Sequence, residues 1–130
     1  MTDNKSGIFK NKKILIVEDD HRNVVSLSFL LEERDIKILT AQNGKEALGV
    51  MKNNPDINLV LMDIMIPEMD GYQTMTEIRK QQQYKDLPII AITAKAMKED
   101  RQKCFDAGAN DYLSKPIDVD QLLSKLENWL

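Results

Sequence analysis

The run Asn58-Leu-Val-Leu-Met-Asp63, followed directly by Ile-Met-Ile-Pro67-Glu-Met-Asp70-Gly71, is the most informative stretch of this 130-residue chain. An apolar segment ends in a single carboxylate, and a turn rich in Pro, Asp and Gly follows. This pattern predicts a buried strand that carries Asp63 at its C-terminal end, where the chain reverses. Functional groups of open parallel sheets gather beyond the carboxyl ends of the strands, so Asp63 is a candidate site residue.

Three other short apolar runs also end in polar groups. One ends in carboxylates, one in a hydroxyl and one in an ammonium group, so a single pocket at the strand ends would collect all three chemistries. These runs and the residues that follow them are Ile14–Val17 with Glu18-Asp19-Asp20, Ile89–Ile92 with Thr93, and Asp111–Ser114 with Lys115-Pro116.

Hydrophobic periodicity predicts strands that alternate with helices along the whole chain. Asp20 and Asp118 are suited to cap the helices that follow them. Short loops between alternating elements indicate an α/β domain with a parallel sheet, right-handed crossovers and helices on both faces. The expected strands are 13–17, 36–40, 57–62, 89–93 and 111–114, and the expected helices are 21 to about 34, 45 to about 52, 72 to about 82, 97 to about 106, and one from 119 onward.

Composition is that of an ordinary globular domain, with 42% hydrophobic and 30% charged residues. We expect a flexible polar segment over residues 1–11 and one domain over residues 12–130. The net charge of −3 provides no basic patch for nucleic acid or for a membrane surface, so we expect neither as a direct partner. The only cysteine, Cys104, excludes an intramolecular disulfide and fits a reducing cytosol.

The candidate residues at the strand ends suit phosphoryl transfer. A carboxylate such as Asp63 can attack phosphorus and form an aspartyl-phosphate. Glu18 and Asp19 beside it would form an all-oxygen pocket, where repulsion is costly without a cation and where Mg²⁺ fits better than a soft metal. Lys115 and Thr93 would supply an ammonium group and a hydroxyl donor to the phosphoryl oxygens.

Each of these residues also has an ordinary structural explanation. Asp63 alone would be read as a turn former or a helix cap, and Glu18-Asp19-Asp20 as a cap with solvated charge. Thr93 alone is a strand residue, and Lys115 before proline is typical of a surface loop. The four strand ends taken together favour the functional interpretation.

This combination resembles the receiver domain of two-component response regulators, over essentially all of residues 12–130. The resemblance implies a flavodoxin-like (βα)5 fold with a doubly wound, five-stranded parallel sheet in the order 2-1-3-4-5. The motifs that carry it are Ile14-Leu-Ile-Val-Glu-Asp-Asp20, Met62-Asp-Ile-Met-Ile-Pro-Glu-Met-Asp-Gly71, Ile89-Ile-Ala-Ile-Thr-Ala94 and Asp111-Tyr-Leu-Ser-Lys-Pro116.

The resemblance also implies a role for each acid. Asp63 would be the phospho-acceptor. Asp19, Asp63 and the backbone carbonyl of Met65 would bind Mg²⁺ directly, with Mn²⁺ as a substitute, and Glu18 would complete the acid cluster.

The remaining implied roles concern the other strand ends. Thr93 and Lys115 would contact the phosphoryl group. Tyr112 would be an aromatic switch that responds to Thr93 and changes the face formed by the fourth helix, fifth strand and fifth helix. A cis peptide bond before Pro116 would turn Lys115 into the pocket.

A phosphorelay function follows from the resemblance. The domain would take a phosphoryl group from a histidine of a kinase transmitter or a histidine phosphotransfer domain, acting as a self-catalysed switch rather than as an enzyme. Residues 93–104 and 107–117 look most like receivers of hybrid sensor histidine kinases, and the alternative is a stand-alone response regulator. The implied location is cytoplasmic, including that of a cytoplasmic module in a membrane-anchored sensor kinase.

Two other function classes fit the residues less well. A phosphohydrolase of the haloacid-dehalogenase type needs a second Asp two residues after the nucleophile, and this chain has Met65 there. A flavin-binding module needs a phosphate-cradling loop after the first strand, but Glu18-Asp19-Asp20 repels phosphate unless a cation intervenes.

Overall fold

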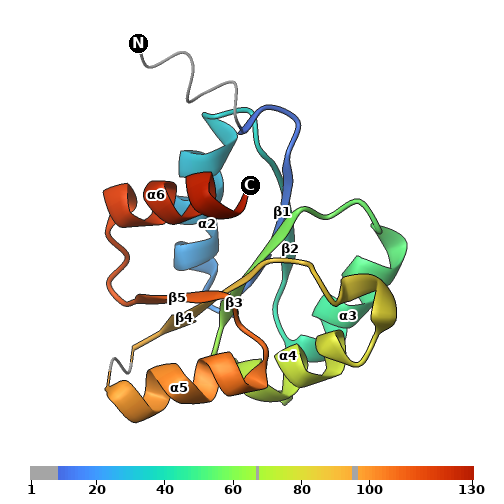
Figure 1. Ribbon diagram of the computed structural model, residues 1–130. Helices are drawn as coiled ribbons and strands as arrows, with labels where there is room; N and C mark the ends of the chain where they lie inside the picture. Colours follow the sequence, from blue (N-terminus) through green and yellow to red (C-terminus); the bar gives the residue numbers. More distant parts are fainter. Residues whose placement is uncertain (1–8, 67, 95–96) are drawn as a thin grey trace.

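A computed structural model of the chain describes residues 9–66, 68–94 and 97–130 (Figure 1). One sheet of five parallel strands has the order β2-β1-β3-β4-β5. The predicted flavodoxin-like order 2-1-3-4-5 is therefore confirmed. The strands are β1 (Lys13–Val17), β2 (Lys37–Ala41), β3 (Leu59–Asp63), β4 (Ile89–Thr93) and β5 (Asp111–Ser114).

Helices cover both faces of this sheet, with α2 and α6 on one side and α3, α4 and α5 on the other (Figure 1). Figure 1 numbers them from α2, so the fourth and fifth helices expected from the sequence are α5 and α6. The helices are α2 (His21–Glu32), α3 (Gly44–Asn53), α4 (Gly71–Arg79), the short 3₁₀ helix η1 (Gln82–Tyr84), α5 (Lys98–Ala107) and α6 (Val119–Trp129).

Capping and burial explain why these segments fold as they do. The side chain of Asp20 accepts from the backbone N–H of Arg22, and that of Asp118 from Gln121, so both predicted caps are confirmed. Every residue of β3 and β4 is buried, as expected for central strands between two helical layers. The sheet therefore separates two apolar layers, and its strand ends are fixed relative to both.

Three element bounds differ from the prediction by more than one residue, each for a local reason. The central strand begins at Leu59 rather than residue 57. The backbone N–H of Lys13, on the neighbouring strand, donates to the side-chain Oδ1 of Asn58 at 2.8 Å instead of to a backbone carbonyl. Helix α2 ends before residue 34, since Asp35 has a positive φ of 65°. Helix α4 stops short of residue 82 because Gln81 is extended.

The N-terminal segment contributes a residue to the core. Phe9 is 2% exposed and belongs to the apolar cluster beneath α2 and α6. The buried ring of Phe9 holds the chain just before β1 against the core. The flexible segment expected over residues 1–11 stays a prediction. Residues 1–8 of that segment lie outside the described residues, and the division of the chain at residue 12 stays a prediction.

Candidate functional site

The three predicted acids lie together at the carboxyl edge of the sheet. Glu18 and Asp19 follow β1, and Asp63 is the last residue of β3, the neighbouring strand. One carboxylate oxygen from each acid lies within 4.8 Å of the other two. Glu18 is 4% exposed and Asp63 is 1% exposed, whereas Asp19 faces solvent. Asp19 is therefore the solvent-facing member of the cluster.

Lys115 is the cation of this site. Its Nζ lies 3.0 Å from Oδ2 of Asp63 and 3.7 Å from Oε1 of Glu18. The backbone N–H of Lys115 donates to the carbonyl of Thr93 at 2.9 Å, which extends the β4–β5 ladder past the strand end and fixes the lysine there. The Lys115–Pro116 peptide bond is cis, as the resemblance implies.

Charge in the site is unevenly balanced. Burial raises the pKa of the Glu18 carboxyl from 4.5 to about 7, and the neighbouring Asp63 adds to that effect. Burial by itself lowers the pKa of Lys115, but the hydrogen bond and charge of Asp63, aided by Glu18 and Asp19, outweigh it and raise that pKa. The single positive charge of Lys115 thus stands against three carboxyl groups. A further cation would reduce the electrostatic repulsion that remains among those carboxyl groups.

The donor set fits a hard divalent cation. Carboxylate oxygens from Glu18, Asp19 and Asp63 converge on one place, and Mg²⁺ prefers such oxygen ligands. The backbone N–H of Met65 donates to Oδ1 of Asp63 at 3.1 Å, so the backbone of Met65 lies at the site. Its side chain is 62% exposed. The role of the Met65 carbonyl as a metal ligand stays a prediction.

The two predicted switch residues lie on neighbouring strands. Thr93, at the end of β4, is 1% exposed and pairs in register with Ser114 of β5. Tyr112 pairs with Ala91, two residues earlier on each strand, and is half-buried. Paired residues of parallel strands point to the same face, so Tyr112 and Thr93 share one face of the sheet.

Two residues near the site were not predicted. The side-chain amide of Asn23 donates to Oε1 of Glu18 at 3.3 Å from the first turn of α2. The guanidinium of Arg101, on α5, donates to the hydroxyl of Tyr112 at 2.8 Å. The sequence held a signal for Asn23. This residue lies in the first turn of the helix that directly follows the acids, so its side chain can reach back to them. For Arg101 the sequence holds no comparable signal.

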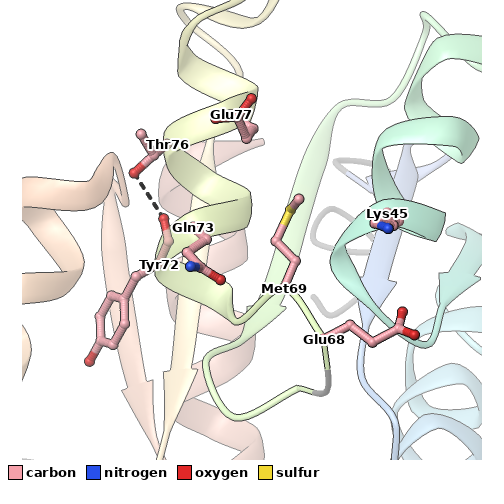
Figure 2. A pocket seen from close by; sticks show the side chains of 7 residues that line it. All are labelled: Lys45, Glu68, Met69, Tyr72, Gln73, Thr76 and Glu77. Carbon is pink, nitrogen blue, oxygen red and sulfur yellow. Dashed lines mark hydrogen bonds between the residues drawn. The ribbon is translucent and has the colours of Figure 1, made fainter.

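Among the described residues, one hollow near these elements borders the acids and another lies apart from them. A hollow of about 560 Å³ between α2 and the β5–α6 loop is lined by Glu18 and Lys115 together with apolar side chains such as Leu27. Another, of about 580 Å³, lies along α4 and is lined by residues such as Tyr72 and Lys45 (Figure 2). None of the three acids lines the second hollow, so it is not part of the site.

Comparison with known proteins identifies the family. Residues 14–127 match the model of the response regulator receiver domain. This chain belongs to the receiver domain family of two-component signalling. Among relatives, the response regulator DivK of Brucella anthropi is 33% identical over 92% of this chain and 96% of its own length. The sensor histidine kinase GacS of Pseudomonas protegens is 36% identical over 90% of this chain, which spans only 13% of GacS.

Solved receiver structures share the fold closely. The receiver domain of the sensor histidine kinase PA1611 from Pseudomonas aeruginosa, solved with a magnesium ion coordinated in its active-site cleft, has a TM-score of 0.84 at 34% identity, covering 92% of this chain and 97% of its own. A chain of the complex between the Saccharomyces cerevisiae phosphotransfer protein Ypd1 and the receiver of Ssk1 has a TM-score of 0.86 at 30% identity, covering 93% and 90%.

None of the helices in residues 9–66, 68–94 and 97–130 is both long and apolar enough to cross a membrane.

Proposed function

We propose that this receiver accepts a phosphoryl group from a phosphohistidine onto Asp63. The observation that carries the proposal is the buried Asp63 carboxylate, with the Lys115 ammonium group 3.0 Å from one oxygen and two further acids beside it. An oxygen of Asp63 attacks phosphorus, the P–N bond to the donor histidine breaks, and the imidazole leaves. Lys115 and Thr93 then stabilise the charge on the phosphoryl oxygens.

The proposed cofactor is Mg²⁺, with Mn²⁺ as a substitute. Asp19, Asp63 and the backbone carbonyl of Met65 would bind it directly, and Glu18 would complete the acid cluster. When bound, the cation supplies positive charge for the phosphoryl oxygens. Support comes from the all-oxygen cluster and from the magnesium-bound receiver of PA1611. The Lys115 ammonium group meanwhile holds Oδ2 of Asp63 at 3.0 Å.

Phosphorylation would then change the face formed by α5, β5 and α6. The new phosphoryl group adds roughly −1.5 to −2 charges and three acceptor oxygens at the end of β3. Thr93 lies at the end of the neighbouring strand, and its hydroxyl would move toward those oxygens. Tyr112 lies on β5, on the same face of the sheet as Thr93, and its ring would move into the space that the Thr93 side chain leaves. A ring with one outward and one inward position is a two-state element that local charge can bias.

The proposed partners are a histidine kinase transmitter and a histidine phosphotransfer domain. The complex of Ypd1 with the Ssk1 receiver supports the second kind of partner. We favour a receiver module within a hybrid sensor histidine kinase, as in GacS, acting in the cytoplasm; the alternative is a stand-alone regulator, as in DivK. A transmitter domain in the natural chain would decide for the hybrid kinase.

Intact mass after incubation with Mg²⁺ and a small acyl phosphate tests the central proposal. We expect one added phosphoryl group in the wild type and none in Asp63→Asn. Asp56→Asn is the matched control, because Asp56 is an exposed acid paired with Lys13 far from the site. Its labelling should equal that of the wild type. Full labelling of Asp63→Asn would contradict the assignment of Asp63 as the acceptor.

A further inference from the structure

The ring and hydroxyl of Tyr112 are held by side chains from α5. The guanidinium of Arg101 donates to the Tyr112 hydroxyl at 2.8 Å. The same guanidinium lies 5.5 Å from the centre of the ring, within the range of a cation–π contact. Phe105, one turn further along α5, meets the ring edge to face at 6.1 Å. One helix therefore supplies three favourable contacts to the half-buried ring in its present position.

A second cation lies near the ring, but it has another partner. Nζ of Lys125, on α6, is 5.8 Å from the centre of the Tyr112 ring. It also donates to Asp111 at 2.8 Å, and Asp111 accepts from the indole of Trp129 as well. Lys125 is thus anchored by Asp111 regardless of where the ring lies.

Arg101 differs from Lys125 in this respect. Within residues 9–66, 68–94 and 97–130, no carboxylate forms an ion pair with the Arg101 guanidinium, and its hydrogen bond is to Tyr112. Movement of the Tyr112 ring would therefore break the contacts of Arg101, whereas Lys125 would keep its contact with Asp111. In the proposed switch the ring moves along this sheet face toward Thr93, and the hydrogen bond to the Arg101 guanidinium is lost.

We propose that Arg101 is a positioning residue that holds Tyr112 in its present half-buried position and so opposes the movement of the ring that switches the α5–β5–α6 face. This inference rests on the proposed function, because the switch matters only if Asp63 is phosphorylated. Arg101 touches neither the acids nor the phosphoryl group and acts through Tyr112. Removing it shifts the equilibrium toward the inward ring, and a ligand that selects the switched state then binds more tightly.

Titration with beryllofluoride, a phosphoryl mimic, in the presence of Mg²⁺ measures this equilibrium. Arg101→Leu keeps a long apolar side chain on α5 but removes the cation and the donor. We expect its apparent affinity for beryllofluoride to rise about fivefold, the factor that corresponds to one hydrogen bond of ordinary net strength. Without beryllofluoride, the amide NMR signals of residues 97–116 in Arg101→Leu should lie partway toward their positions in the beryllofluoride-bound wild type.

Lys103→Leu is the matched control. Lys103 lies two residues further along α5, and its Nζ is 4.5 Å from the centre of the Tyr72 ring rather than that of Tyr112. The substitution removes the same charge and a similar cation–π contact. It should leave both the affinity and the resting NMR signals near those of the wild type. Equal changes in Arg101→Leu and Lys103→Leu would overturn the proposal, because charge alone would then explain them.

A double-mutant cycle with Tyr112→Phe keeps the test valid if Arg101→Leu is destabilised. Tyr112→Phe retains the ring but removes the hydroxyl that Arg101 binds. Arg101→Leu should change the affinity less in this background than in the wild type, and equal changes in both would overturn the positioning role. If the wild type binds beryllofluoride and Arg101→Leu binds it with the same affinity, the positioning role of Arg101 is refuted and the proposed function is not. A wild type that binds no beryllofluoride refutes the proposed function itself, and the role of Arg101 with it.

Discussion

At the scale of single residues, Gly71 sets how closely the start of α4 approaches Asp63. A Cβ atom at Gly71 would lie 2.6 Å from Cα of Ile64 and 2.8 Å from the carbonyl oxygen of Asp63. The backbone N–H of Gly71 also donates to the carbonyl of Ile64 at 2.9 Å. Both clashing atoms belong to the backbone of Asp63 and Ile64. No side-chain movement relieves such a clash, so only the main chain near Asp63 can give way.

Gly71→Ala should therefore destabilise the fold and disturb the site. We expect a loss of about 1–3 kcal/mol in the free energy of unfolding, the usual cost of overpacking, and weaker Mg²⁺ binding. Gly49→Ala is the control, because a Cβ there meets nothing within 4 Å and lies on the exposed side of α3. Alanine in place of glycine inside that helix should raise the free energy of unfolding by roughly 0.5–1 kcal/mol. Urea unfolding measures whether the free energy of unfolding falls in Gly71→Ala and rises in Gly49→Ala. A more stable Gly71→Ala would refute the close approach of the Gly71 backbone to Asp63 and Ile64.

At the scale of elements, Asp111 fastens α6 to the start of β5. Its carboxylate accepts from Nζ of Lys125 at 2.8 Å, from Nε1 of Trp129 at 3.1 Å, and from the backbone N–H of Tyr112. Burial alone would raise the pKa of Asp111, but these donors outweigh it and lower the pKa below its ordinary value. The ionised carboxylate is thus favoured more in the folded than in the unfolded state.

The sign of the pH dependence follows from that lowered pKa. The stabilisation by Asp111 is fully present above the unfolded pKa of about 3.9, and it is lost as the pH falls through the lower folded value. Asp111→Asn should therefore be less stable than the wild type at neutral pH, and the difference should shrink below about pH 4. Urea unfolding followed by circular dichroism at several pH values measures it. A difference that is constant down to pH 2 would show that the charge of Asp111 is not responsible.

The elements also show what the sequence could and could not predict. The strands were predictable from their apolar runs, and the resemblance to receiver domains supplied the sheet order that brings Asp63 beside Glu18. The role of Arg79 was not predictable: its guanidinium donates to the carbonyls of Tyr84 in η1 and of Gly108 after α5, and so joins α4 to both. Contacts of that kind depend on side-chain directions across the fold, which no periodicity records.

At the scale of the whole molecule, the acid cluster links local charge to global stability. Its carboxylates come from the ends of two strands that are adjacent only in the folded sheet. The unfolded chain holds no such cluster, so a cation that binds it stabilises the folded state alone. In the absence of that cation, repulsion among these acids, which Lys115 balances only in part, weakens the fold.

Mg²⁺ should therefore raise the melting temperature of the wild type. At a concentration 100 times its dissociation constant, the gain in the free energy of unfolding should be about 2.7 kcal/mol. Asp19→Asn removes one proposed ligand and part of the repulsion, so it should melt no lower than the wild type without Mg²⁺ and respond to the ion much less. Asp56→Asn, at an exposed acid outside the cluster, should respond as the wild type does. If Mg²⁺ shifts the melting of all three proteins equally, the ion binds elsewhere and the acid cluster is not its site.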